Sequence, residues 1–149
     1  MHLDGSSEWA TRTTAFVLLR EGKLAEARES IQKTSAQPLM GRELLVTCLD
    51  ASQAANLNTV AQRAESAALS SHDPEPRYFI ASLLAYCGQK DAALRLLRSA
   101  SQQNYCAYTA LQTDPLFSKL RSDADFVQVR SAAKECQDNF LKGRNQAVQ

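Results

Sequence analysis

Two stretches of this chain carry the same pattern of residues, and this internal repeat constrains the fold more than any other feature. In each stretch an apolar helical stripe runs into a glycine, and an alanine follows five positions later: Gly22 to Ala27, and Gly88 to Ala93. The two glycines are 66 residues apart, close to two periods of roughly 34 residues. A helix pair of this size cannot bury its apolar face alone, so repeated pairs pack on one another. The pattern therefore predicts stacked helix hairpins.

Charge and composition narrow the class of protein. The 149 residues include 17 Lys and Arg against 16 Asp and Glu, with only five glycines and four prolines. The small number of glycines and prolines favours helices. A nucleic-acid-binding domain usually carries a concentrated basic surface, so the balanced charge argues against that partner. The length predicts one domain that spans residues 1–149.

Neither a membrane segment nor a metal site is expected. The apolar run Ala15–Leu19 is far shorter than the roughly 20 residues that cross a bilayer, and the first residues lack the basic and apolar regions of a secretory signal. The cysteines form no CxxC pair, so we expect four reduced thiols, no cofactor and a cytoplasmic location. A zinc site or a structural disulfide is the alternative. The cysteines are Cys48, Cys87, Cys106 and Cys136.

The expected helices form three pairs. The first pair covers about 8–21 and 24–34, with Gly22 in the left-handed conformation at the turn, and the third covers about 77–87 and 90–101 around Gly88. The middle pair begins with a helix over about 39–54 and continues from a cap at Asn58. Asn56 occupies the register position of the glycine, and asparagine tolerates the left-handed conformation better than most residues.

Cap residues mark the helices that follow. Asp73 and Asp114 each precede a proline, which is a favoured start for a helix. Residues 122–125 have the S-x-x-D form of a capping box. The last helix, over about 124–143, then carries one apolar stripe that would cover the end of the array, with 144–149 as a frayed tail. The stripe is Phe126, Val129, Ala133, Cys136 and Phe140.

At these positions the chain resembles the tetratricopeptide repeat family over roughly residues 8–101. The third pair resembles it through Pro74, Ala81, Leu84, Gly88, Ala93, Leu97 and Ala100, and the first through Ala15, Leu18, Gly22, Ala27 and Ile31. The resemblance implies an all-α fold, a right-handed superhelix of about three antiparallel helix pairs. It places the repeats at about 8–38, 39–73 and 74–104, with a capping segment at 105–143.

The segment 104–126 is similar to the ends of repeat arrays in bacterial signalling proteins. In those proteins such arrays follow winged-helix DNA-binding domains or serine/threonine kinase domains. This similarity implies that the chain is an interaction module of a larger bacterial signalling or regulatory protein.

The family resemblance also implies a binding surface. Its groove is lined mainly by the first helix of each pair, and a mixture of aromatic, basic and acidic side chains there suits a peptide or a partner helix. The family's clamp for C-terminal carboxylates has only Arg12 as a counterpart, so a receptor for such tails is not expected. The groove positions carried over are Arg12, Phe16, Arg20, Glu43, Val46, Asp50, Gln53, Tyr78, Ser82 and Tyr86.

Two other classes of function compete with this interpretation. Catalysis needs a nucleophile or an acid/base pair set in a pocket, and His2 and His72 both fall in expected coil. We therefore expect a protein that is not an enzyme. Self-association into a homo-oligomer is the alternative function, and light scattering distinguishes a monomer from an assembly.

Overall fold

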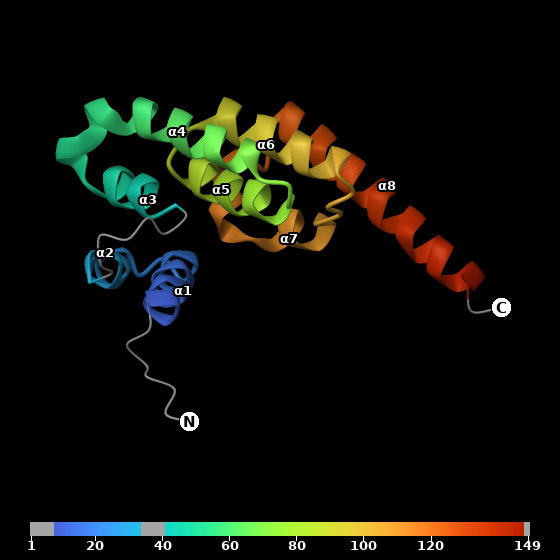
Figure 1. Cartoon of the computed structure of the whole chain (residues 1–149), viewed down its shortest axis with the longest axis horizontal. Coiled ribbons are helices and arrows are strands. Elements are labelled where there is room, and N and C mark those ends of the chain that lie inside the picture. The colour runs from blue at the N-terminus through green and yellow to red at the C-terminus, as the bar shows by residue number, and fades with distance from the viewer. Residues whose placement is uncertain (1–7, 34–40, 148–149) are drawn as a thin grey trace, which may run out of the picture. The chain divides into compact units, whose positions relative to one another are not determined.

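The computed structural model describes residues 8–33 and 41–147, including the side chains of 13–33 and 41–144. Every regular element in these ranges is helical, which confirms the expected all-α class (Figure 1). The contacts group the chain into two compact units, Met1–Ala64 and Glu65–Gln149. Along the chain the elements are α1 (Glu8–Arg20), α2 (Leu24–Gln32), α3 (Arg42–Leu49), the 3₁₀ helix η1 (Ala51–Asn56), α4 (Leu57–Ser70), α5 (Glu75–Tyr86), α6 (Lys90–Gln102), α7 (Tyr108–Thr113), the 3₁₀ helix η2 (Pro115–Leu120) and α8 (Ala124–Ala147).

The two repeated glycines form the same turn. Gly22 has φ +74° and Gly88 has φ +77°, the left-handed conformation that glycine adopts most readily. The Gly22 N–H donates to the Leu19 carbonyl at 3.1 Å, and the Lys23 N–H donates to the Leu18 carbonyl at 2.9 Å. The same two bonds, at the same spacing, close the turn at Gly88. Both turns are therefore Schellman motifs, as expected from the glycine at the C′ position.

Behind these turns, small residues let the paired helices approach closely. Ala27 and Ala93, each five residues after its glycine, are fully buried. In the first unit α1 contacts α2, which buries Ala27 and Ile31. In the second unit α5 contacts α6, and α6 buries Ala92, Ala93, Leu94, Leu96, Leu97 and Ala100.

The expected middle helix is interrupted, so the prediction of one helix over about 39–54 is wrong. Helix α3 ends at Leu49, and Asp50 is extended with φ −109° and ψ 108°. The Asp50 carboxylate accepts a hydrogen bond from the Ser52 N–H at 2.9 Å. Such a local bond competes with helix continuation and starts η1 instead.

The turn expected after this helix is also different. Asn56 does not have a positive φ, and the only described non-glycine residue that does is Asn104. Instead, η1 ends at Asn56 and α4 begins at Leu57, so Asn58 lies inside the helix and is not its cap. The predicted end of the first repeat, near residue 38, lies outside the described residues.

Aspartate side chains begin three elements of the second unit. Asp73 accepts from the Glu75 N–H at 2.9 Å before α5, and Asp114 accepts from the Leu116 N–H at 3.0 Å before η2. Both caps agree with the sequence prediction. At α8 the capping side chain is Asp123 and not the predicted Ser122. The Asp123 carboxylate accepts hydrogen bonds from the N–H groups of residues 125 and 126. A carboxylate at a helix N-terminus also interacts favourably with the helix dipole.

The C-terminal segment covers the α5–α6 hairpin within the second unit. Helix α5 contacts η2, and α6 contacts α8. The ring of Phe117, on η2, lies 5.7 Å from that of Tyr78 and 5.5 Å from that of Phe126. Phe117 and Phe126 are fully buried. Of the predicted stripe on α8, Phe126, Val129 and Ala133 are buried, whereas Phe140 is 62% exposed.

A buried arginine joins the end of α4 to this hairpin. One guanidinium nitrogen of Arg77 donates to the carbonyls of Leu69 and Ser71, and another donates to the Ser99 hydroxyl at 2.9 Å. Arg77 therefore satisfies carbonyls that the last turn of α4 leaves without a helical partner.

The cysteines differ from the prediction of reduced thiols. Cys106, before α7, and Cys136, on α8, form a disulfide with a Cα–Cα distance of 5.4 Å. None of the four cysteines is a free thiol. The two residues of this pair are 30 positions apart in the sequence and belong to no short motif. They meet because α7 contacts α8.

Candidate functional site

Two of the predicted groove residues are not on the surface. Phe16 is 5% exposed, and Ser82 is fully buried with its hydroxyl donating to the Phe79 carbonyl at 2.7 Å. The prediction that these two side chains line an open groove is therefore wrong. For Ser82 the reason is that α5 is buried on more than one side, because both α6 and η2 contact it. The side chain of Arg12 lies outside the described residues.

The two predicted tyrosines make contacts within the second unit. The Tyr78 ring lies 5.6 Å from the Tyr105 ring and also contacts Phe117. The ammonium group of Lys119 lies 5.3 Å from the centre of the Tyr86 ring and donates to the Tyr86 carbonyl at 2.7 Å. Burial raises the pKa of the Tyr86 hydroxyl. Both rings therefore help to hold the C-terminal segment against α5.

Three further predicted residues make local polar contacts in the first unit. A guanidinium nitrogen of Arg20 lies 3.4 Å from the Phe16 carbonyl. Glu43 forms an exposed ion pair with Arg63, and the Gln53 side chain accepts from Asn56 at 2.8 Å. The contacts of Glu43 and Gln53 are exposed and contribute little to stability, so these two side chains remain candidates for contact with a partner.

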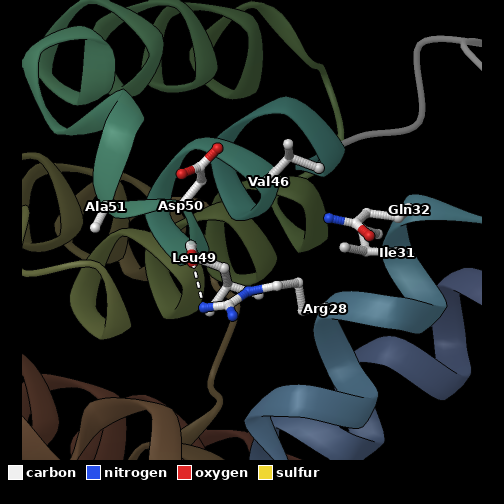
Figure 2. Close-up of a pocket in the computed structure, with 7 residues that line it drawn as sticks. All are labelled: Arg28, Ile31, Gln32, Val46, Leu49, Asp50 and Ala51. Atoms are coloured by element: carbon white, nitrogen blue, oxygen red, sulfur yellow. Dashed lines mark hydrogen bonds between the residues drawn. The ribbon is translucent and has the colours of Figure 1, made fainter.

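The structure brings together the remaining two predicted residues, Val46 and Asp50, at a pocket of about 440 Å³ in the first unit. Figure 2 shows that α2 forms one side of this pocket and the end of α3 forms the other. The described residues that line it are Arg28, Ile31, Gln32, Val46, Leu49, Asp50 and Ala51.

One side of the pocket is defined by a bond between the two helices. The Arg28 guanidinium donates to the carbonyl of Leu49 at 2.5 Å, drawn as a dashed line in Figure 2. Leu49 is the last residue of α3, so this bond satisfies a carbonyl at the helix C-terminus. A cation is stabilised there because the helix dipole is negative at that end. Arg28 thus holds α2 against α3 and adds positive charge to the pocket.

The pocket also carries a negative charge and an apolar wall. One carboxylate oxygen of Asp50 accepts from the Ser52 hydroxyl at 2.7 Å as well as from its N–H, and these bonds lower the pKa of Asp50. Asp50 is therefore ionised at neutral pH. Ile31 and Leu49 are buried, while Val46 is half-buried and Ala51 is exposed. The pocket can therefore accept an apolar side chain beside both charges.

The charged side chains that line the pocket are Arg28 and Asp50. The described residues that line it include no histidine, cysteine, serine or lysine, so none of them is a ready nucleophile or a general base that titrates near neutral pH. Elsewhere in the described part of the chain, no group of three or more His, Cys, Asp or Glu side chains could hold a metal ion.

Sequence reasoning missed most of the pocket. Arg28 and Gln32 come from the second helix of the first pair, whereas the predicted groove used only first helices. Ala51 reaches the pocket because the chain changes direction at Asp50. The signal that could have located this break is the Asp-x-Ser sequence at 50–52, which favours a local side-chain turn.

Comparisons with known proteins do not identify a family for this chain. No protein-family model, curated protein or solved structure matches the chain. None of the helices in the described ranges has the length and apolar character needed to cross a bilayer.

Proposed function

We propose that this chain is a non-catalytic protein-interaction module of the tetratricopeptide type, and that a peptide or a partner helix binds at the pocket between α2 and α3. The observation that carries the proposal is the pocket itself, in which an apolar wall lies between the cation of Arg28 and the anion of Asp50. Pockets of this kind orient an apolar anchor side chain through a few polar groups.

The proposed ligand follows from that chemistry. An apolar side chain of the partner would contact Val46 and the exposed edge of Leu49, and a basic group next to it would face the Asp50 carboxylate. The two like-built hairpins support a helical-repeat scaffold, since repeats of this kind present binding surfaces rather than catalytic groups. In this proposal the module belongs to a larger bacterial signalling or regulatory protein, and a cofactor is not required.

The disulfide changes the proposed location. A cytoplasmic protein keeps its cysteines reduced, and structural disulfides persist mainly in oxidising compartments. Because Cys106 and Cys136 are paired, we propose that the chain matures in an oxidising environment rather than in the cytoplasm. Alkylation of the protein isolated from its native host, followed by mass spectrometry, distinguishes the two locations.

A peptide selection tests the binding site. Random peptides displayed on phage are selected against the full chain, and their affinities are measured by fluorescence anisotropy. The variant Val46→Asp places a charge on the apolar wall and is expected to weaken the selected peptides about tenfold or more, or about 1.4 kcal/mol. Val17→Asp is the matched control, because Val17 is a valine of the first unit that is 47% exposed and is not among the described residues that line the pocket.

Two results would overturn the proposal. Either no peptide is enriched by the chain, or the enriched peptides bind Val46→Asp as tightly as the unchanged protein. A hydrolase, lyase or transferase activity of the purified chain would contradict the non-catalytic part of the proposal.

A further inference from the structure

The disulfide of the second unit lies beside an open hollow. Cys106 and Cys136 are both half-buried, and Cys106 is one of the residues that line a hollow of about 390 Å³. The other described residues that line it are Tyr105, Ala107, Thr109, Ala110 and Gln137. None of these side chains is acidic, so no carboxylate among them repels an incoming thiolate. The hollow therefore gives a thiol in solution a route to Cys106 that does not require the unit to unfold.

The segment 106–111, which we call the flap, runs between two anchored ends. Before it, the Tyr105 N–H donates to a carbonyl in the last turn of α6 at 3.1 Å. After it, the Arg121 guanidinium donates to the carbonyls of Gln112 and Asp114. Neither anchor involves a residue of the flap, so both would remain if the disulfide were opened.

Between its anchors the flap has few other restraints. Helix α7, which begins within it, has six residues and buries only Leu111, and a helix this short is not stable by itself. The Lys134 ammonium lies 5.9 Å from the centre of the Tyr108 ring. Lys134 is exposed and also pairs with Asp138, so this contact contributes little. The disulfide to α8 is therefore the main restraint on the flap.

We propose that the Cys106–Cys136 disulfide is a thiol-exchange site, and that its reduction by an external dithiol releases the flap from α8. The thiolate enters through the hollow and attacks Cys106, because Cys136 is not among the described residues that line it. Release of the flap uncovers the part of α8 that α7 contacts. This site belongs to the second unit and does not depend on the proposed binding of a peptide in the first.

Two exchange steps reduce the bond. In the first, a thiolate of the dithiol bonds to the Cys106 Sγ, the bond between the cysteines breaks, and Cys136 leaves as a thiolate that takes up a proton. In the second, the other thiolate of the dithiol attacks its own sulfur in this mixed disulfide, and Cys106 leaves and takes up a proton. The protein gains two electrons and two protons, and the dithiol becomes a disulfide.

The rate of reduction in urea tests whether the folded protein reacts. The full chain is treated with dithiothreitol at urea concentrations below the unfolding transition, quenched with acid and alkylated, and mass spectrometry follows the peptides that contain Cys106 and Cys136. If the folded form reacts, the rate of reduction should hardly change with urea. If the bond opens only after the unit unfolds, the rate rises in parallel with the unfolding equilibrium, and this result would overturn the proposal.

A leucine in the hollow tests the route of attack. Ala110→Leu narrows the hollow and is expected to slow reduction about tenfold, or about 1.4 kcal/mol in the barrier. Gln112→Leu is the matched control, because it adds the same side chain to the same helix at an exposed position that is not among the described residues lining the hollow. Equal rates in the two variants would contradict the proposed route.

The position of the first adduct tests the direction of attack. Glutathione, which has one thiol, cannot complete the second step by itself, so the mixed disulfide can be trapped with acid and located by mass spectrometry. The adduct is expected on Cys106. An adduct on Cys136 would contradict the proposal that the thiolate enters through the hollow.

Amide hydrogen exchange tests the release of the flap. The unchanged chain is compared with Cys106→Ser/Cys136→Ser without reductant, so that the other cysteines stay oxidised. In the double variant the amides of residues 106–111 are expected to exchange faster, whereas α5 and α6 stay protected. The proposal is overturned if the flap keeps its protection in the double variant, or if the whole second unit loses it.

Discussion

The hairpins α1–α2 and α5–α6 have the same turn but very different amounts of burial. Each closes on a left-handed glycine with the same two hydrogen bonds, and each places a buried alanine five residues later. Yet α2 buries two of its nine residues, whereas α6 buries six of its thirteen. The repeated pattern therefore determines how the chain turns, and other parts of the chain determine how deeply the hairpin is covered.

The covering of α5–α6 comes from the C-terminal segment. Phe117 and Phe126 complete an aromatic cluster with Tyr78, and the Cys106–Cys136 disulfide fixes α8 to the segment before α7. In the first unit, Phe16 is the one aromatic residue among the described side chains, so no such cluster forms there. Two apolar residues of its hairpin, Val17 and Leu24, are exposed. We therefore expect the second hairpin to be the more sensitive of the two to changes in packing.

The largest expected effect is at the aromatic cluster. Phe117→Ala removes a fully buried ring and is expected to lower the free energy of unfolding by about 3–5 kcal/mol. Ile31→Ala, at a fully buried position of α2, is expected to cost about 2 kcal/mol, the lower end for such changes, because α2 buries few other residues and can shift to fill the cavity. Urea unfolding measures both. An equal or larger loss for Ile31→Ala would contradict the proposed difference between the hairpins.

The Cys106–Cys136 disulfide should contribute almost as much to the free energy of unfolding as the Phe117 ring. Cys106→Ser/Cys136→Ser is expected to destabilise the second unit by about 3 kcal/mol, because the bond constrains the unfolded chain across 30 residues. The measurement is urea unfolding without reductant, so that the other cysteines stay oxidised. An unchanged midpoint would show that the bond does not stabilise the cover of α5–α6.

Overpacking compares the two hairpins at equivalent positions. Ala93→Leu is expected to cost about 1–3 kcal/mol, since α6 is enclosed and cannot move away from α5. Ala27→Leu should cost less, although Ala27 is equally buried, because α2 has fewer buried neighbours to displace. Ala132→Leu, at an exposed position on α8, is the control and should leave the melting temperature nearly unchanged. Equal losses at Ala27 and Ala93 would rule out the difference in enclosure.

At the turns the two hairpins should behave alike. Gly22→Ala and Gly88→Ala are each expected to cost about 1 kcal/mol, because alanine is strained at positive φ. A Cβ at either position meets no atom within 4 Å, so the backbone alone sets the cost. Gly143→Ala, inside a helix, is expected to be stabilising. Clearly unequal losses at the two turns would show that packing also contributes there.

The smallest expected effect is the pH dependence of the cap on α8. The Lys90 ammonium, together with the N–H groups of α8, holds the pKa of Asp123 below its ordinary value of 3.8. This stabilisation is therefore present above pH 3.8 and lost as the pH falls through the lower, folded-state pKa. Asp123→Asn retains the cap but loses the charge, so its thermal stability should be slightly lower at neutral pH. In acid the two proteins should converge, and a constant difference would contradict this.

Much of the local structure could be predicted from short stretches of sequence. The glycines at the turns, the buried alanines that follow them, and the caps at Asp73 and Asp114 all depend on interactions within a few residues. The same local reasoning was wrong where two local options competed. At Asp50 a side-chain bond to Ser52 ended the helix, and before α8 the cap was Asp123 rather than its neighbour Ser122.

The candidate site was less predictable. Val46 and Asp50 were identified, but Arg28 and Ala51 reach the pocket only through the packing of α2 on α3 and the change of direction after α3. Phe16 and Ser82 were assigned to a surface although both side chains are buried. Periodicity shows that one face of a helix is apolar, but it does not show how many faces become covered.

Helices, turns and caps in this protein were thus set by short-range chemistry, because backbone conformation and side-chain hydrogen bonds act between residues close in the chain. The pocket beside Arg28, the pairing of Cys106 with Cys136 and the exposure of Phe140 were decided only when distant segments packed. Each depends on which helix faces end up in contact, and many packings of the same amphipathic helices satisfy the same local rules.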